Sequence, residues 1–555
     1  MRIAVVPGDE GSGRLCVLDA DDRPSGEVRH VADLTAAVGA VEDAAAEPPR
    51  WVWADTGEVY PALVERSVRL GRCHDITLVE SLLLGHAGRF GEAHSLGAAW
   101  ARLHGHVVPP DPVRSAGTGA ETPPALFEPD LSTLPPGVDP LTAVIEVHAD
   151  QRRRIAAIAH PGRFALLGAV ESAGAMTAVE MGHDGVPWRP DLHDQVLSEQ
   201  LGKRPARGDR PPVLAELAAR ISAEFGRTVN PDSPVQLLKA FGAIGHPVPS
   251  TRSWVLKEVD HPVIPHLLRY KELARLHSAH GWSWLDSWVR GGRFRPDYVV
   301  GGVVSGRWAT RGGGALQIPK IVRRAVMADP DRTLVTVDAG QLEPRILAAV
   351  SGDSALAAAA GSEDLYTRLA GEFGGDRERA KIGVLAAMYG QTGGDAAPLL
   401  AVMRRTFPRA MDYVDGAAGL GERGRLVRSW LGRTCPPPSP SWRRVAGDSG
   451  DGARAARERG RFTRNFVIQA TAAEWALVLM AAVRRGLTRL DPAPGTAQLV
   501  FFQHDELVLH VPRALAGPVV ELLHDAEEQT RALLFGPTPV RFPLDISVVD
   551  CYADA

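Results

Sequence analysis

The stretch from Thr333 to Gly352 constrains the chain most, because it changes from strand to helix at a carboxylate. Leu334, Val335 and Val337 form a short apolar run that predicts a buried strand. The strand ends at Asp338, and apolar residues then recur at helical spacing. An Asp in this place can bind a metal ion, although it more often caps the following helix. The stretch alone leaves both interpretations open.

A second segment, far along the chain, favours the metal interpretation. Two apolar runs, residues 499–502 and 507–511, flank the polar segment Gln503–Glu506 and predict a β-hairpin with acids at its tip. Asp338 and Asp505 would then stand at the ends of separate strands. Carboxylate oxygens suit Mg²⁺, and two such ions roughly 3.5–4 Å apart stabilise the attacking and leaving oxygens of phosphoryl transfer. The two segments therefore predict a site for two magnesium ions, provided that their strands are neighbours.

Residues 377–390 predict a helix that could bind a nucleotide. Arg377, Lys381, Leu385 and Tyr389 are each four residues apart, so successive members rotate by roughly 40° and all four share one broad face. Two cations suit the phosphates of a nucleoside triphosphate, and the apolar and aromatic groups suit its sugar and base. Taken alone, the segment is more typical of an ordinary amphipathic helix with Leu385, Met388 and Tyr389 in the core.

These segments together resemble three motifs of the family A DNA polymerases, the bacterial DNA polymerase I type. Asp338–Arg345 resembles motif A, Arg377–Gly390 resembles motif B, and Gln503–Glu506 resembles motif C, in the family's order. The resemblance covers residues 160–555 well and the first 150 residues poorly. It implies a mixed α/β fold: a right-hand polymerase with palm, fingers and thumb, preceded by an RNase H-like α/β domain of the exonuclease type.

The resemblance also implies roles for individual residues. Asp338 and Asp505 would bind two Mg²⁺ ions, with the backbone carbonyl of Ala339 as a further ligand, and Glu506 would support this catalytic site. Glu343 would be the steric gate that disfavours a ribose 2′-OH, and His504 would position the primer end. The implied nucleotide-binding residues are Gln341, Glu343, Arg377, Lys381, Leu385, Tyr389 and His504. The implied DNA-binding residues are Arg307, Gln317, Arg461, Asn465 and Gln469.

The activity that the resemblance implies is template-directed addition of deoxynucleotides to a primer 3′-OH, with primer-template DNA and dNTPs as partners. One alternative is a non-catalytic DNA-binding protein derived from a polymerase. Another is an RNA-synthesising enzyme or a nuclease, against which Glu343 and the order of the motifs argue. The chain departs from the family at Leu385, where an aromatic residue is usual, and at Ala339 and Gly340, where Tyr and Ser are usual. We therefore expect weaker discrimination among nucleotides.

Five segments are expected along the chain. They are a degenerate 3′–5′ exonuclease-like domain (1–160), the thumb (161–300), a first part of the palm (301–355), the fingers (356–485) and a second part of the palm (486–555).

The chemistry of proofreading is expected to be absent from the first segment. Its first strand has no Asp-x-Glu, and the best match to the family's third exonuclease motif, Val144–His148, lacks both the Tyr and the Asp. Because charged side chains are mostly exposed, the nearby acids are interpreted as solvated surface residues. These acids are Asp55, Glu58, Glu146 and Asp150.

Composition adds only weak constraints. The net charge of −4 gives no overall basic signature for nucleic acid; a local cluster, formed by five arginines between residues 454 and 464, is suited to template or phosphates. The four cysteines are scattered and form no CxxC pair, which is typical of reduced thiols. No signal peptide is apparent, and no apolar stretch approaches the roughly 20 residues that span a bilayer. We expect a monomeric, cytoplasmic protein at the nucleoid, without membrane contact.

Overall fold

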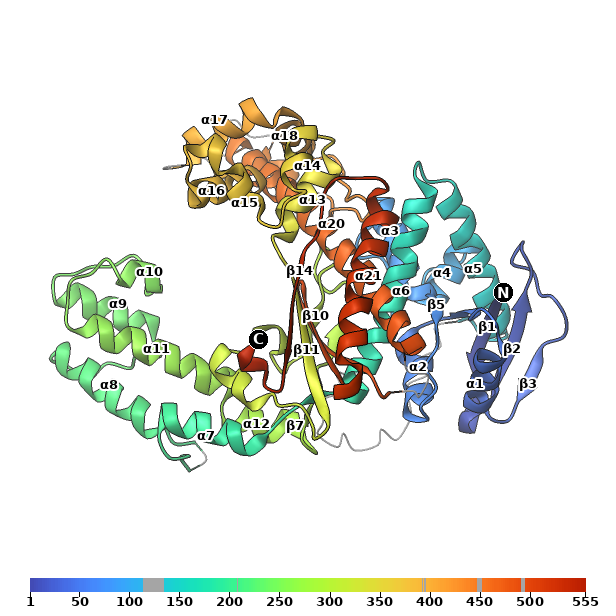
Figure 1. Ribbon diagram of the computed structural model, residues 1–555, viewed down its shortest axis with the longest axis horizontal. Helices are drawn as coiled ribbons and strands as arrows, with labels where there is room; N and C mark the ends of the chain where they lie inside the picture. Colours follow the sequence, from blue (N-terminus) through green and yellow to red (C-terminus); the bar gives the residue numbers. More distant parts are fainter. Residues whose placement is uncertain (113–133, 207, 392, 394–395, 447–451, 491–494) are drawn as a thin grey trace. The chain divides into compact units, whose positions relative to one another are not determined.

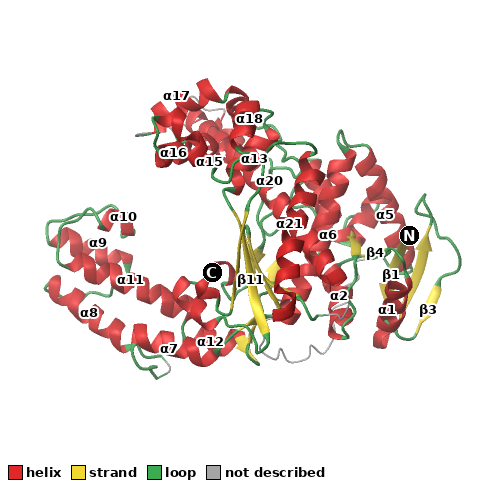
Figure 2. Cartoon of the chain, viewed as in Figure 1, coloured by secondary structure: helices red, strands yellow, loops and turns green. Residues whose placement is uncertain are grey.

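The computed structural model describes residues 1–112, 134–206, 208–391, 393, 396–446, 452–490 and 495–555. The fold is mixed α/β, as predicted, and helices predominate over strands (Figure 2). The chain forms two compact units. The first unit contains residues 1–184, 297–311 and 335–548, and the second contains residues 185–296, 312–334 and 549–555 (Figure 1).

The N-terminal part of the first unit is built on a five-stranded sheet with the order β3-β2-β1-β4-β5. The central strand β1 pairs antiparallel with β2 and parallel with β4. The elements are β1 (Arg2–Pro7), β2 (Gly13–Leu18), β3 (Arg29–Val31), β4 (Arg50–Trp53), β5 (Arg72–Asp75), α1 (Leu34–Ala44), α2 (Thr56–Glu65), α3 (Ile76–His86), α4 (Leu96–Leu103) and α5 (Pro140–Ala156).

One face of this sheet closes on helix α6 (Pro161–Asp184). Met176 of α6 lies in the same apolar core as Trp51, Trp53 and Tyr60, all of them fully buried. The N-terminal core therefore extends past residue 160 along the chain.

The acids of this region do not all face solvent. Asp55 is only 8% exposed, and it caps α2 by accepting a 2.7 Å hydrogen bond from the Gly57 N–H. The interpretation of Asp55 as a solvated acid is therefore wrong. The backbone N–H groups in the first turn of a helix have no acceptor within the helix, so they can donate to a buried carboxylate. Glu58 is exposed, whereas Glu146 and Asp150 are half-buried.

Two long helices pass through the first unit, α6 and the 39-residue α20 (Gly452–Leu490). Both are long and apolar enough to cross a membrane by length and composition, so the expectation that no stretch approaches this limit is wrong. Within the protein, 61% of the apolar window of α6 and 83% of that of α20 are buried. Such burial is typical of core helices in a folded domain.

A four-stranded sheet, ordered β12-β13-β11-β14, forms the middle of the first unit. Its strands are β11 (Arg332–Ala339), β12 (Gln498–Gln503), β13 (Glu506–Pro512) and β14 (Leu544–Val549), so the predicted hairpin at residues 499–511 is confirmed. Helix α13 (Leu342–Val350) follows β11 directly. The other helices of this region are α14 (Ser354–Ala359), α15 (Leu365–Leu369), α16 (Arg377–Tyr389), α17 (Ala396–Thr406), α18 (Pro408–Glu422), α19 (Pro440–Ala446) and α21 (Ala516–Phe535).

The second unit is mainly helical. Its core holds an aromatic cluster in which Trp188, Trp284 and Phe294 lie with ring centroids 5.0–5.7 Å apart. The Trp284 indole N–H also donates a 2.7 Å hydrogen bond to the Gly313 carbonyl. The helices are α7 (Pro190–Leu201), α8 (Pro212–Glu224), α9 (Pro234–Ala243), α10 (Ser253–Leu256), α11 (Val263–His280) and α12 (Trp282–Trp288).

Candidate functional site

The two predicted metal-binding acids stand on neighbouring strands. Asp338 is the second-last residue of β11, and Asp505 immediately precedes β13, which lies beside β11 in the sheet. The residues before Asp338 in β11, from Thr333 to Val337, are buried, whereas Asp338 itself is exposed. The sheet therefore brings to one edge two acids that are 167 positions apart in the chain.

The electrostatics of Asp505 show that the two carboxylates interact. Its pKa is raised to about 6, first by burial and next by the negative charge of Asp338. Like charges held together in this way are costly unless a cation neutralises them. The donor set, two carboxylates and the main-chain carbonyl of Ala339, consists of the hard oxygen ligands that fit Mg²⁺. No larger group of three or more His, Cys, Asp or Glu side chains arranged for a metal occurs in the described part of the chain.

Backbone strain marks both turns at this edge. Gln341, between β11 and α13, has φ 56°, and His504, in the two-residue turn between β12 and β13, has φ 60°. Residues other than glycine rarely adopt the left-handed region, and such outliers cluster at functional sites. Gln341 follows Asp338 by three residues, and His504 directly precedes Asp505.

Glu343 lies at the centre of a hydrogen-bonded group beside the two acids. The Arg307 guanidinium donates to Glu343 Oε1 at 2.6 Å, and the Tyr389 hydroxyl donates to Oε2 at 2.7 Å. The pKa of His504 is lowered by burial and by the positive charge of Arg307, and the charges of Arg307 and Glu343 also act on Asp505. The structure thus brings five of the predicted residues together: Arg307, Glu343, Tyr389, His504 and Asp505.

Helix α16 presents the predicted stripe of four residues away from its buried face. Arg377 is exposed, and Lys381, Leu385 and Tyr389 are half-buried. Residues such as Ala380, Val384 and Ala387 form the buried face instead. Leu385 and Tyr389 are therefore not core residues, whereas Met388 is buried, so the alternative of an ordinary amphipathic helix loses two of its three core residues.

Sequence analysis missed Asp364, which joins two of the motifs. Its carboxylate accepts hydrogen bonds from Gln341 Nε2 at 2.9 Å and from Arg377 Nε at 2.8 Å. The side-chain amide of Gln341 is thereby occupied inside the protein, because its oxygen also accepts from the Leu365 N–H at 2.9 Å. The only local signal was that of a helix cap before Leu365, and it says nothing about the long-range partners.

Arg345 has a structural role that sequence analysis also missed. It is fully buried, and its guanidinium donates to five carbonyls, those of Gly340 (3.1 Å), Ala360 (2.8 Å), Ser362 (3.0 Å), Arg541 (2.9 Å) and Glu363. Burial lowers the pKa of Arg345 to about 10. Arg345 therefore fastens the turn after Asp338 to the surrounding chain.

Helix α20 places three predicted DNA-binding residues on one face. Arg461, Asn465 and Gln469 recur every four residues, and they are exposed or half-buried on a helix whose other residues here are mostly buried. Arg464 is buried instead: it donates to the Ala387 carbonyl at 2.5 Å and pairs with Asp415. The prediction that Arg464 belongs to the DNA-facing basic cluster is therefore wrong, because internal partners compensate its charge.

Gln317 belongs to the second unit, where it ends a short 3₁₀ turn, Ala315–Gln317. It is exposed, and its amide oxygen accepts a 3.4 Å hydrogen bond from Arg275 of α11.

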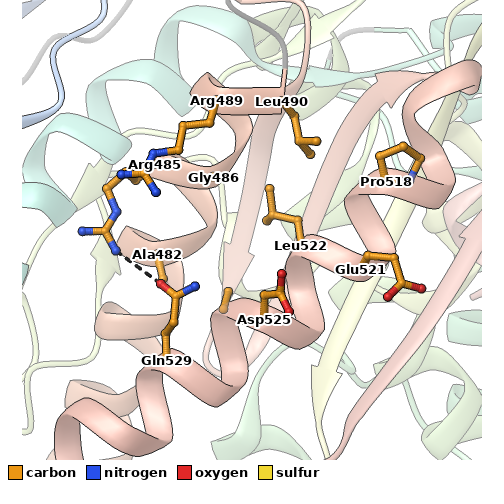
Figure 3. Close-up of a pocket in the computed structure, with 11 residues that line it drawn as sticks. Ala482, Arg485, Gly486, Arg489, Leu490, Pro518, Glu521, Leu522, Asp525 and Gln529 are labelled. Atoms are coloured by element: carbon orange, nitrogen blue, oxygen red, sulfur yellow. Dashed lines mark hydrogen bonds between the residues drawn. The ribbon is translucent and has the colours of Figure 1, made fainter. Parts of the chain in front are cut away.

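A groove of about 440 Å³ lies elsewhere in the first unit, between the C-terminal end of α20 and α21 (Figure 3). Arg485 and Arg489 line one wall, and Glu521 and Asp525 line the other. These four side chains are exposed, and the groove contains none of the predicted site residues. Solvated charges of both signs on an open surface indicate no particular ligand.

Comparison with known proteins agrees with this geometry. Residues 211–550 match the family model described as DNA polymerase family A. The chain is 28% identical over 381 residues to DNA polymerase I of Chloroflexus aurantiacus, covering 60% of this chain and 38% of that protein. It is 26% identical over 421 residues to the thermostable DNA polymerase I of Thermus aquaticus, covering 66% and 48%. The chain thus spans less than half the length of these two relatives.

A similar fold occurs in a solved structure, the POL domain of Pol1 from M. smegmatis in complex with DNA primer-template and dNTP. The TM-score is 0.71 at 19% sequence identity, and the match covers 100% of this chain and 95% of that one. The likeness shows that the fold is shared over the whole length of the chain.

Proposed function

Because the chain belongs to DNA polymerase family A, we propose that it is a template-directed DNA polymerase. Its substrates are primer-template DNA and dNTPs, and it joins each nucleotide to the primer 3′-OH with loss of pyrophosphate. The observation that carries the proposal is the meeting of Asp338 and Asp505 on neighbouring strands, where the charge of one acts on the other.

Asp338, Asp505 and the Ala339 carbonyl would hold two Mg²⁺ ions, and Glu506 would support them. The bound ions would stabilise the attacking and leaving oxygens of the reaction. Arg377 and Lys381 neutralise the triphosphate, and preorganised charge of this kind is usually the largest catalytic contribution.

Glu343 serves as the gate against ribonucleotides. Its carboxylate is held from both sides by Arg307 and Tyr389, so it cannot turn away easily from a sugar placed beside α16. Leu385 on that helix offers no aromatic ring, and neither does Ala339 at the end of β11 nor Gly340 after it. Discrimination among sugars is therefore weaker than in members with aromatic residues there. Steady-state insertion of dNTP, ddNTP and rNTP tests this statement, and selectivity equal to that of such members contradicts it.

DNA contacts the exposed face of α20 at Arg461, Asn465 and Gln469, and it contacts Arg307 in the same unit. Gln317, in the second unit, is a separate DNA contact. Arginine and amide side chains contact phosphates and base edges.

Proofreading is absent from this polypeptide. The N-terminal sheet carries Ala4 and Val6 in its first strand, with no acidic pair, and Asp55 is used as a helix cap. An assay for excision of a mismatched primer 3′ end, made with Asp338→Ala to silence synthesis, should detect no excision. Excision by that variant would refute this part of the proposal.

Primer extension on a defined template tests the whole proposal. The wild-type chain should extend the primer in Mg²⁺, and Asp338→Ala and Asp505→Ala should abolish extension. Asp545→Ala is the matched control, because Asp545 is an exposed acid on β14 of the same sheet. A wild-type chain that binds the duplex without extending it would indicate the alternative, a DNA-binding protein derived from a polymerase.

A further inference from the structure

We infer that Asp364 is a positioning residue for nucleotide binding, because it holds Arg377 in place through Nε and ties it to the turn that follows Asp338. The inference rests on the proposed function, since it needs a triphosphate for Arg377 to bind. Asp364 lies in the segment between α14 and α15, outside all three motifs.

The two oxygens of the Asp364 carboxylate have different partners. Oδ1 accepts from Gln341 Nε2 at 2.9 Å, and Oδ2 accepts from Arg377 Nε at 2.8 Å. Gln341 follows Asp338 by three residues, and Arg377 begins α16. One side chain therefore links the turn at the metal-binding acids to the first cation of the nucleotide-binding helix.

The contact with Asp364 involves Nε and leaves the two terminal nitrogens of the Arg377 guanidinium to bind a phosphate. An arginine has five N–H donors in a fixed fork, and Asp364 takes only the Nε donor, while Arg377 Nη1 lies 3.0 Å from Glu378. The Arg377 side chain remains 44% exposed. A guanidinium anchored at Nε loses less freedom when a phosphate binds its outer nitrogens, so anchoring favours nucleotide binding.

Helix capping does not explain the carboxylate. Asp364 does cap α15 by accepting from the N–H groups of Tyr366 and Thr367, at 2.9 and 3.1 Å. Asn caps helices equally well and can still accept from Gln341, but it cannot form an ion pair with Arg377. The pKa of Asp364 is well below its usual value: burial opposes the shift, and the hydrogen bond from Arg377 is the largest cause that lowers it. Asp364→Asn therefore removes the ion pair and leaves the cap.

Single-nucleotide insertion by the full-length chain on a saturating primer-template tests the inference. Asp364→Asn should raise the KM for dNTP by about five- to tenfold, the range expected for a charged hydrogen bond weakened by solvent, and should change kcat less. Glu378→Gln is the matched control, because Glu378 is the other acid beside Arg377 but contacts it at Nη1 rather than at Nε and lies on α16 itself. It should not raise the KM.

A double-mutant cycle separates positioning from a general effect on the fold. In an Arg377→Ala background, Asp364→Asn should raise the KM no further. A rise of equal size in both backgrounds would overturn the inference, and so would an unchanged KM in the single variant.

Arg377→Lys is a second, independent test, because lysine keeps the positive charge but lacks the guanidinium, whose Nε binds Asp364 while its terminal nitrogens bind a phosphate. It should raise the KM about as much as Asp364→Asn, and a normal KM for Arg377→Lys would overturn the inference even if Asp364→Asn failed to fold. Failure of the proposed function itself would look different, since the wild-type chain would then insert no nucleotide at all.

Discussion

Replacing Arg484 of α20 by Met should destabilise the chain through a buried ion pair. Arg484 is 8% exposed, and its guanidinium donates to Glu180 of α6 at 2.8 and 2.6 Å and to the Leu70 carbonyl at 2.6 Å. It also lies 3.0 Å from the hydroxyl of Tyr60 in α2. The same arginine thus joins the N-terminal region to helix α20, which carries Gln469 fifteen residues earlier.

The size of the effect follows from the charge left behind. Removing one partner of a buried pair costs about 3–5 kcal/mol, because the other charge stays buried without compensation. Arg69 lies 3.6 Å from Glu180 and keeps part of the compensation, so we expect about 3 kcal/mol in the free energy of unfolding. Arg484→Met combined with Glu180→Gln should recover most of this loss, since the double variant leaves no buried carboxylate charge at residue 180.

The loss should depend on pH. The pKa of Glu180 is lowered in the folded protein: burial opposes the shift, and the positive charge of Arg484 is the largest cause that lowers it. A carboxyl group whose pKa is lower in the folded state than in the unfolded state contributes stability at pH values above its unfolded-state pKa. That contribution disappears as the pH falls through the folded-state pKa. The deficit of Arg484→Met should therefore be largest near pH 7 and shrink below about pH 4.5.

Urea unfolding followed by circular dichroism at pH 7 and pH 4 measures both effects. Arg485→Met is the control, because Arg485 is exposed and its contact with Gln529 is 3.4 Å long; it should change stability by no more than about 0.5 kcal/mol. The reasoning is refuted if Arg484→Met loses no more than the control, or if its deficit is the same at both pH values.

Three further predictions follow from single contacts. Arg345→Met leaves five backbone carbonyls without their donor, so urea unfolding should show a loss of about 3–5 kcal/mol at roughly 1 kcal/mol each; a loss below about 1 kcal/mol would show that water replaces the guanidinium. Glu343→Ala should raise insertion of rNTP relative to dNTP by about tenfold or more in single-nucleotide assays, and an unchanged ratio would remove Glu343 from the gate. Burial and the charge of Asp55 raise the pKa of Asp75 to about 7, so the folded state keeps a proton that the unfolded state loses, and stability should fall as the pH rises from about 4 to 7. Asp75→Asn should flatten that fall, and an unchanged pH profile of the melting temperature would contradict it.

Much of the site could be predicted because its signals are local. The strand that ends at Asp338 and the hairpin around Asp505 are each visible in fewer than twenty residues of sequence, through apolar runs and the polar breaks between them. The face shared by Arg377 and Tyr389 follows from helical spacing alone. That the strands of Asp338 and Asp505 are neighbours was a condition of the prediction, and the sheet order meets it.

The rest depends on partners that no local pattern identifies. Asp364 shows only the signature of a helix cap, and its link to Arg377 exists because α15 and α16 pack against each other. Arg484 and Glu180 are 304 positions apart. Asp55 was expected in solvent because most charges are exposed, yet a helix terminus compensates it. Arg464 was expected to contact template or phosphates, yet an internal ion pair compensates it.

Counting bound divalent ions tests the central claim most directly. Electron paramagnetic resonance titration with Mn²⁺, in the presence of primer-template and a non-hydrolysable dNTP, should show two tightly bound ions per chain. Asp338→Asn and Asp505→Asn should each remove at least one of them, whereas Asp545→Asn should keep both. Unchanged binding in both Asp338→Asn and Asp505→Asn would contradict the claim that these two carboxylates form one metal site.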